Sequence, residues 1–394
     1  MKHITKTVLT LSMVSLFTDT ASEMLYPIMP IYLKSIGFSI LLIGVLEGFA
    51  EAIAGLSKGY FGKLSDSSAR RVPFVQLGYG LSAISKPLMV VFAYPLWIFF
   101  ARTIDRLGKG IRTGARDALL SDEATPETKG KVFGFHRSMD TFGAVLGPSI
   151  ALLYLYYYPE NYNVLFLLAF IPGLLALFAS FFLKEKNAIK SIEKKPISFL
   201  SFIHYWKDSP LRYRKVVIGL LAFTLFNSSD IFLLLQAKQS GLSDTLVLAI
   251  YIFYNLVYAV FAFPLGILAD KIGLKNVFIF GLLLFAAVYF GIAYNTNTTI
   301  FFFLFLLYGI YAAATEGISK AWISNITEKK DTATAIGTYA GFQSICTLMA
   351  STMAGLIWFQ WGPETTFIVT GIATVVVALY FALITSASFS RQMR

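Results

Sequence analysis

Apolar runs long enough to cross a membrane follow one another along almost the whole of this 394-residue chain. A helix needs roughly 17–25 mainly apolar residues to span the hydrocarbon layer of a bilayer. Only 14% of the residues are charged, whereas soluble domains have about 25%. The chain is therefore predicted to be an all-α polytopic membrane protein. Twelve spans are predicted, at residues 7–33, 40–62, 73–93, 95–119, 130–157, 162–183, 214–237, 244–268, 275–294, 299–324, 332–358 and 364–387.

Basic residues are concentrated near both ends of the chain, in alternate loops and in the segment 184–213. Placing these regions on the cytoplasmic side leaves little basic charge outside beyond Lys34 and Lys238, as the positive-inside rule requires. We therefore expect an integral protein of a bacterial cytoplasmic membrane with both termini in the cytoplasm. The net charge of +11 then follows from this topology, and no nucleic-acid partner is expected.

The chain divides near its middle into two similar halves. Residues 1–183 hold six predicted spans, 184–213 form a polar, basic linker, and 214–394 hold six more. The segment from Gly62 to Asp66 follows the second span, and a similar segment from Gly266 to Asp270 follows the eighth. Parallel repeats of this kind are known in transporters whose solute site lies near the bilayer midplane, between the repeats.

The fourth predicted span carries an unusual row of charges. Arg102, Asp105, Lys109, Arg112 and Arg116 recur at steps of three and four, so they share one helix face. Charges in hydrocarbon cost several kcal/mol each and persist where they face a bundle interior, a partner or a water-filled cavity. The row is therefore predicted to line a solute or ion pathway. An alternative for its end nearest the cytoplasm is that the arginines only brace the helix terminus.

Acidic pairs add to the charge expected at membrane depth. Asp19 and Glu23 are four residues apart in the first span, so they repel each other unless one is protonated or both share a cation. Glu51, four residues after Glu47, is a further acid in the second span. Structural salt bridges between helices remain the alternative to a functional role.

In the second half, the main acids are Asp230 and Glu316. As an alternative to a functional role, Glu316 forms an ion pair with Lys320, four residues further along the helix. Four polar residues of the eighth span share one helix face. These residues are Tyr251, Tyr254, Asn255 and Tyr258. We expect them to contact either a ligand or, as the alternative, neighbouring helices.

Three local motifs resemble those of the major facilitator superfamily, and the resemblance covers the full chain. The segments beginning at Gly62 and Gly266 look like the Gly-x-x-x-Asp-x-x-x-Arg signature of that family. Arg102, followed by Gly108 and Gly110, is similar to its Arg-x-x-x-Gly-x-Gly motif. The run Gly143-Ala-Val-Leu-Gly147-Pro148 looks like the Gly-x-x-x-Gly-Pro motif associated with antiporters. In the first copy, Ser67-Ser68-Ala69 replaces the usual basic residue and glycine.

The resemblance implies two pseudo-symmetric six-helix bundles that work by alternating access. Proton coupling is expected from Asp19, Glu23, Arg102 and Asp105. Solute binding is expected from Lys109, Arg112, Asp230 and Glu316. Gating is expected from Asp66 with Arg70 and Arg71, from Asp270, and from Gly143, Gly147 and Pro148.

The leading functional hypothesis is proton-coupled export of a small organic solute, anionic or zwitterionic, by a monomer that needs no cofactor. Alternatives are a proton-coupled importer of an organic anion, a lipid or amphiphile transporter, and a receptor or scaffold that transports nothing. The chain has no phosphate-binding Gly-x-x-x-x-Gly-Lys loop, no Gly-x-Ser-x-Gly elbow and no metal-spaced His/Cys cluster. It is therefore not expected to be an enzyme or to hold a metal.

Overall fold

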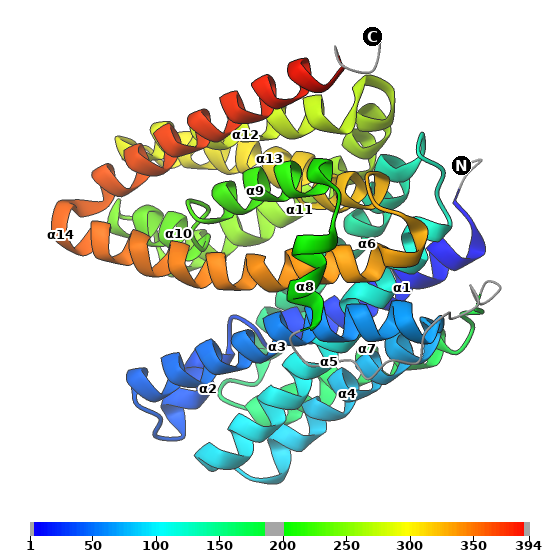
Figure 1. The fold of residues 1–394 in the computed structure, drawn as a ribbon. Coiled ribbons are helices and arrows are strands. Elements are labelled where there is room, and N and C mark those ends of the chain that lie inside the picture. Colours follow the sequence, from blue (N-terminus) through cyan, green and yellow to red (C-terminus); the bar gives the residue numbers. More distant parts are fainter. Residues whose placement is uncertain (1–3, 186–200, 390–394) are drawn as a thin grey trace. The chain divides into compact units, whose positions relative to one another are not determined.

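The computed structural model describes residues 4–185 and 201–389, and the part of the predicted linker at 186–200 lies outside the described residues. All regular secondary structure in the described part of the chain is helical, as Figure 1 shows. The helices are α1 (Lys6–Glu23), α2 (Met29–Ser35), α3 (Ile40–Ser68), α4 (Val72–Val91), α5 (Pro95–Asp122), α6 (Lys129–Tyr157), α7 (Tyr162–Ser180), α8 (Ser201–Asp208), α9 (Leu211–Thr224), α10 (Ile231–Gln239), α11 (Asp244–Ile272), α12 (Leu274–Ala293), α13 (Thr298–Asn325), the short 3₁₀ helix η1 (Lys329–Asp331) and α14 (Thr332–Phe389).

Each of the twelve predicted spans corresponds to a helix, a pair of short helices or one arm of a bent helix. Within the described residues, seven helices are long and apolar enough to cross a membrane by length and composition: α4, α6, α7, α11, α12, α13 and α14. The last of these bends at Gly362, whose φ of 85° suits glycine, and Pro363 follows the bend. Figure 1 shows the bend where α14 turns from orange to red, so this helix supplies two spans.

Two of the spans are interrupted helices. The first divides into α1 and α2 near Pro27, and the seventh divides into α9 and α10 at residues 225–230. The second interruption contains Asn227, Ser228, Ser229 and Asp230, whose short polar side chains compete for backbone hydrogen bonds. Membrane transporters often bind solutes and ions at such interruptions.

The chain forms two compact units that exchange two segments. The first unit comprises Met1–Thr125, Ser138–Asp208 and Thr327–Ser344, and the second comprises Pro126–Arg137, Ser209–Ile326 and Ile345–Arg394. The first turns of α14 thus belong to the first unit, and the first turns of α6 belong to the second. The predicted boundaries at 183 and 214 cut the chain into sequential halves and do not describe this exchange.

Close helix packing inside the first unit fixes the position of the charged helix α5. This helix packs against α3 on one side and α4 on the other. A Cβ atom built on Gly78 of α4 would lie 2.6 Å from the carbonyl oxygen of Gly108 in α5, so only glycine permits this approach. The two backbones are therefore close enough for polar side chains of α4 to reach those of α5.

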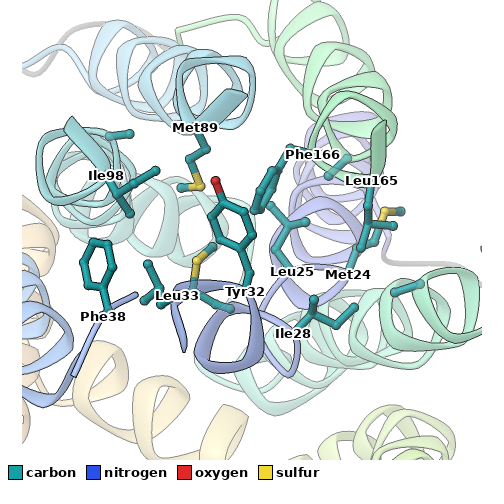
Figure 2. Packing of buried hydrophobic residues seen from close by; sticks show 14 residues of the cluster. Met24, Leu25, Ile28, Tyr32, Leu33, Phe38, Met89, Ile98, Leu165 and Phe166 are labelled. Carbon is teal, nitrogen blue, oxygen red and sulfur yellow. The ribbon is translucent and has the colours of Figure 1, made fainter. Parts of the chain in front are cut away.

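An apolar cluster holds one end of the first unit together, with Tyr32 of α2 at its centre (Figure 2). The Tyr32 ring meets Phe166 of α7 edge-on, with ring centroids 4.9 Å apart. Met89 of α4 and Ile98 of α5 complete the surroundings of this ring. In this way the short helix α2 is fixed to three longer helices despite the interruption that precedes it.

Candidate functional site

Two buried charges of the first unit form an ion pair between α4 and α5. Lys86 Nζ lies 2.7 Å from Asp105 Oδ1, and Ser22 of α1 accepts a second bond from the same ammonium group at 3.4 Å. The Lys86 side chain is only 2% exposed. Lys86 is a partner that the sequence analysis missed. It is the only charged residue of the otherwise apolar helix α4, and that isolation was the available signal.

The buried charges continue along α5 toward its C-terminal end. The Arg112 guanidinium donates to Ser82 Oγ at 2.6 Å and lies over the Tyr79 ring, 4.6 Å from its centroid. One turn further on, Arg116 pairs with its neighbour Asp117 at 2.8 Å. These residues are buried and hydrogen-bonded inside the first unit, which is the arrangement expected of charges that do not face lipid.

A second group of charges in the same unit combines two exposed side chains, Glu51 and Lys109, with two that are largely buried, Lys58 and Arg106. Glu51 of α3 has a side chain that is 44% exposed, and it lies 3.8 Å from Lys58 Nζ and 3.7 Å from a guanidinium nitrogen of Arg106. Lys109, one turn after Arg106 on α5, is exposed. We call these four residues the Glu51 group. It contains three cations and one carboxylate, so it carries a positive excess on an accessible surface.

The acids of the first span lie beside the glycine motif of α6. A Cβ atom on Gly143 would be 2.9 Å from Asp19 Cβ and 2.5 Å from the Leu16 carbonyl oxygen of α1. A Cβ atom on Gly147 would be 2.6 Å from the backbone nitrogen of Met24, next to Glu23. Both acids are partly buried. The two glycines therefore bring α6 into direct backbone contact with the acidic part of α1.

The repeated Gly-x-x-x-Asp motifs have matching environments in the two units. In the first unit, Asp66 Oδ2 accepts from the Thr334 backbone nitrogen at 2.7 Å, at the start of α14. In the second unit, the Asp270 carboxylate accepts from the backbone nitrogens of Gly130 and Lys131, at 2.7 and 2.8 Å, at the start of α6. Each aspartate thus caps the positive end of a helix dipole.

The two arginines that follow the first motif differ in their surroundings. Arg71 is buried, pairs with Asp66 at 3.3 Å and with Asp122, and donates to the Lys329 carbonyl oxygen at 3.0 Å. Arg70 is exposed. Burial raises the pKa of the Asp66 carboxyl to about 6, although Arg71 and the hydrogen bonds from Thr334 favour its charged form. Arg71 therefore provides the electrostatic contact with Asp66.

In the second unit, the predicted acids have different kinds of partners. Glu316 of α13 lies 3.7 Å from a guanidinium nitrogen of Arg137, which also donates to the Tyr258 hydroxyl. Asp230, at the interruption between α9 and α10, accepts hydrogen bonds from the Tyr254 hydroxyl and, at 3.5 Å, from Ser229. Tyr254 and Tyr258 of α11 thus contact charged groups from other segments of the second unit.

A family model described as Major Facilitator Superfamily matches residues 11–254 and 231–391 of the chain. The chain belongs to this superfamily. An uncharacterised MFS-type transporter of Methanocaldococcus jannaschii is 34% identical over 389 residues, covering 97% of this chain and 96% of the relative. The staphyloferrin B transporter of Staphylococcus aureus is 25% identical over 376 residues, covering 90% and 87% of the two chains.

Solved structures of the superfamily share the fold. The human organic anion transporter MFSD10 superposes with a TM-score of 0.83 at 15% identity, over 95% of this chain and 98% of its own. The proton:xylose symporter XylE gives 0.74 at 17% identity, over 97% and 96%. The predicted family and all-α fold are confirmed. The protein is an integral membrane transporter of a small solute and not an enzyme.

Proposed function

We propose that this superfamily member exports a small organic anion by alternating access and couples its movement to protons. The observation that carries the proposal is the positive excess of the Glu51 group. Lys58 and Arg106 both lie within 4 Å of Glu51, and Lys109 adds a third cation that is exposed. A carboxylate or phosphate of the solute is attracted to such a surface, because arginine and lysine together provide charge and several hydrogen-bond donors.

The Lys86–Asp105 pair is the second part of the proposal. Protonating Asp105 would leave the Lys86 ammonium buried without its counter-charge, which is costly in a low-dielectric interior. A rearrangement of α4 against α5 relieves that cost, so proton binding has an energetic route to a change in helix packing. Arg102, also buried on α5, and the α1 acids Asp19 and Glu23 are the further proposed members of the coupling site.

One comparison supports the anionic class, a second supports transport of a solute, and a sequence motif supports the direction. The solved structure with a TM-score of 0.83 is named as an organic anion transporter, and a relative matching 90% of this chain is named as a staphyloferrin B transporter. The Gly143–Pro148 motif, which packs against α1, favours export. We further propose a cytoplasmic-membrane location with both termini inside, because this orientation places the basic linker on the cytoplasmic side.

The test uses purified protein in liposomes that contain a pH-sensitive dye. Small organic anions, cations, zwitterions and lipids are offered from either side, with and without a proton gradient. We expect proton flux that depends on an organic anion and is lost in Asp105→Asn. Lys109→Gln should raise the KM for anions at least threefold, whereas Lys34→Gln, at an exposed lysine in the last turn of α2, should not. Neutral-solute flux with equal efficiency would contradict the anionic assignment, and inward accumulation would replace export by import.

A further inference from the structure

Asp230 is a partly buried carboxylate without a cationic partner in the described part of the chain. Its hydrogen bonds come from the Tyr254 hydroxyl and from Ser229, and no Lys, Arg or His forms an ion pair with it. The buried carboxylates Asp66, Asp105 and Asp117 of the first unit each pair with a lysine or arginine. Partial burial makes a carboxylate without a counter-charge less favourable than a compensated one, so a positive charge from outside the described chain would stabilise Asp230.

The surroundings of Asp230 are aromatic. The Tyr254 ring meets Tyr251 edge-on at a centroid distance of 5.5 Å and Tyr308 edge-on at 5.3 Å. Tyr308 in turn lies 5.2 Å from Tyr311. The hydroxyls of Tyr254, Tyr289 and Tyr308 all lie within electrostatic range of the Asp230 carboxylate. Several rings from α11, α12 and α13 thus gather around one acid.

Two further hydroxyls in this region are buried. Ser228 Oγ, two residues before Asp230, and Tyr289 Oη form no close hydrogen bond within the described residues beyond a weak contact with each other. Ser228 is 5% exposed and Tyr289 is 0% exposed. Buried polar atoms are nearly always hydrogen-bonded in folded proteins. Two weakly bonded hydroxyls beside a carboxylate without a cation can accept or donate further hydrogen bonds to a polar ligand group.

We infer that Asp230 and the tyrosines around it bind the ammonium group of the transported solute. Aromatic rings attract organic cations through the negative potential of their faces, and a carboxylate supplies the counter-charge. The inference rests on the proposed function only in taking this ligand to be the transported solute. A solute that carries an amine as well as an acid would agree with both this inference and the proposed function.

The test measures equilibrium binding of radiolabelled choline to the full-length protein in nanodiscs, with no transport step. Its competitor is 3,3-dimethylbutan-1-ol, in which carbon replaces the charged nitrogen at nearly unchanged shape. We expect saturable choline binding at least tenfold tighter than binding of the neutral alcohol. Asp230→Asn should weaken choline binding at least tenfold, whereas Glu364→Gln, which removes an exposed carboxylate of the same unit, should leave it unchanged.

A second pair of variants tests the aromatic wall if Asp230→Asn does not fold. Tyr254→Phe keeps the ring and should bind choline within threefold of the unmodified protein, whereas Tyr254→Leu should bind at least fivefold more weakly. Equal affinity for choline and the alcohol, absence of saturable binding, or equal loss in the two Tyr254 variants would overturn the inference. Choline binding without anion flux would support the ammonium site and contradict the proposed organic-anion transport. Anion flux without choline binding would support organic-anion transport and contradict the ammonium site.

Discussion

Lys86 Nζ lies 2.7 Å from Asp105 Oδ1 where α4 packs against α5, and the two side chains are only 2% and 9% exposed. The pair joins the one charged residue of α4 to the highly charged helix α5. Because each charge is compensated mainly by the other, the two should behave as one unit in stability and in transport.

A double-mutant cycle on this pair tests that relationship. Lys86→Gln or Asp105→Asn alone leaves one buried charge without its partner, and each should lower the free energy of unfolding by about 3–5 kcal/mol. The double variant removes both charges and should regain most of that loss. Denaturant unfolding of the purified protein in detergent gives the four values. Additive losses would show that the two residues do not depend on each other.

The glycine contacts between α1 and α6 predict a sharp difference between glycine positions. Gly143→Ala places a methyl group 2.5 Å from the Leu16 carbonyl oxygen, so the helices must separate, at a cost of about 1–3 kcal/mol. The control is Gly80→Ala in α4, where the nearest atom would be 3.6 Å away. That variant should gain up to about 1 kcal/mol, because alanine favours the helix. Thermal unfolding midpoints compare the two variants, and a stable Gly143→Ala protein would contradict the packing argument.

Neighbouring arginines offer a matched test of the first Gly-x-x-x-Asp motif. Arg71→Gln removes the contacts with Asp66, Asp122 and the Lys329 carbonyl oxygen, and it should cost about 3–5 kcal/mol because buried charges lose their partner. Arg70→Gln changes an exposed side chain and should stay within about 0.5 kcal/mol. Unfolding curves of both variants provide the measurement. A larger loss of stability for Arg70→Gln than for Arg71→Gln would show that the contact with Asp66 is made by Arg70 and not by Arg71.

The raised pKa of Asp66 predicts a pH-dependent contact with the start of α14. When the contact opens, Asp66 becomes exposed and its pKa returns toward the ordinary 3.8, from about 6 in the closed contact. The closed contact then binds more protons, so it is favoured in acid and loses this advantage as the pH rises through about 6. Between pH 7.5 and pH 5 the balance should move about tenfold toward the closed form.

Thiol labelling follows this equilibrium directly. A cysteine replaces the fully buried Ala335 in a Cys346→Ser background, and its labelling rate is divided by the rate in the same protein carrying Asp66→Asn. This ratio cancels the intrinsic pH dependence of the thiol. It should fall about tenfold from pH 7.5 to pH 5. A ratio that does not change with pH would show that Asp66 keeps its charge in the closed contact.

The sequence by itself determined the class of the protein, because long apolar runs leave a chain no soluble alternative and each run can satisfy its backbone only as a helix. Helical spacing also placed Asp105 and Arg112 on one face, and both are buried. Spacing within one helix carries no information about neighbouring helices. Only the tertiary structure paired Asp105 with Lys86, distinguished Arg71 from Arg70 and left Asp230 among tyrosines without a cation. The two residues of each of these contacts lie 5 to 24 positions apart in the sequence or in different helices. They come together only through helix packing, such as the contact of Gly78 with Gly108.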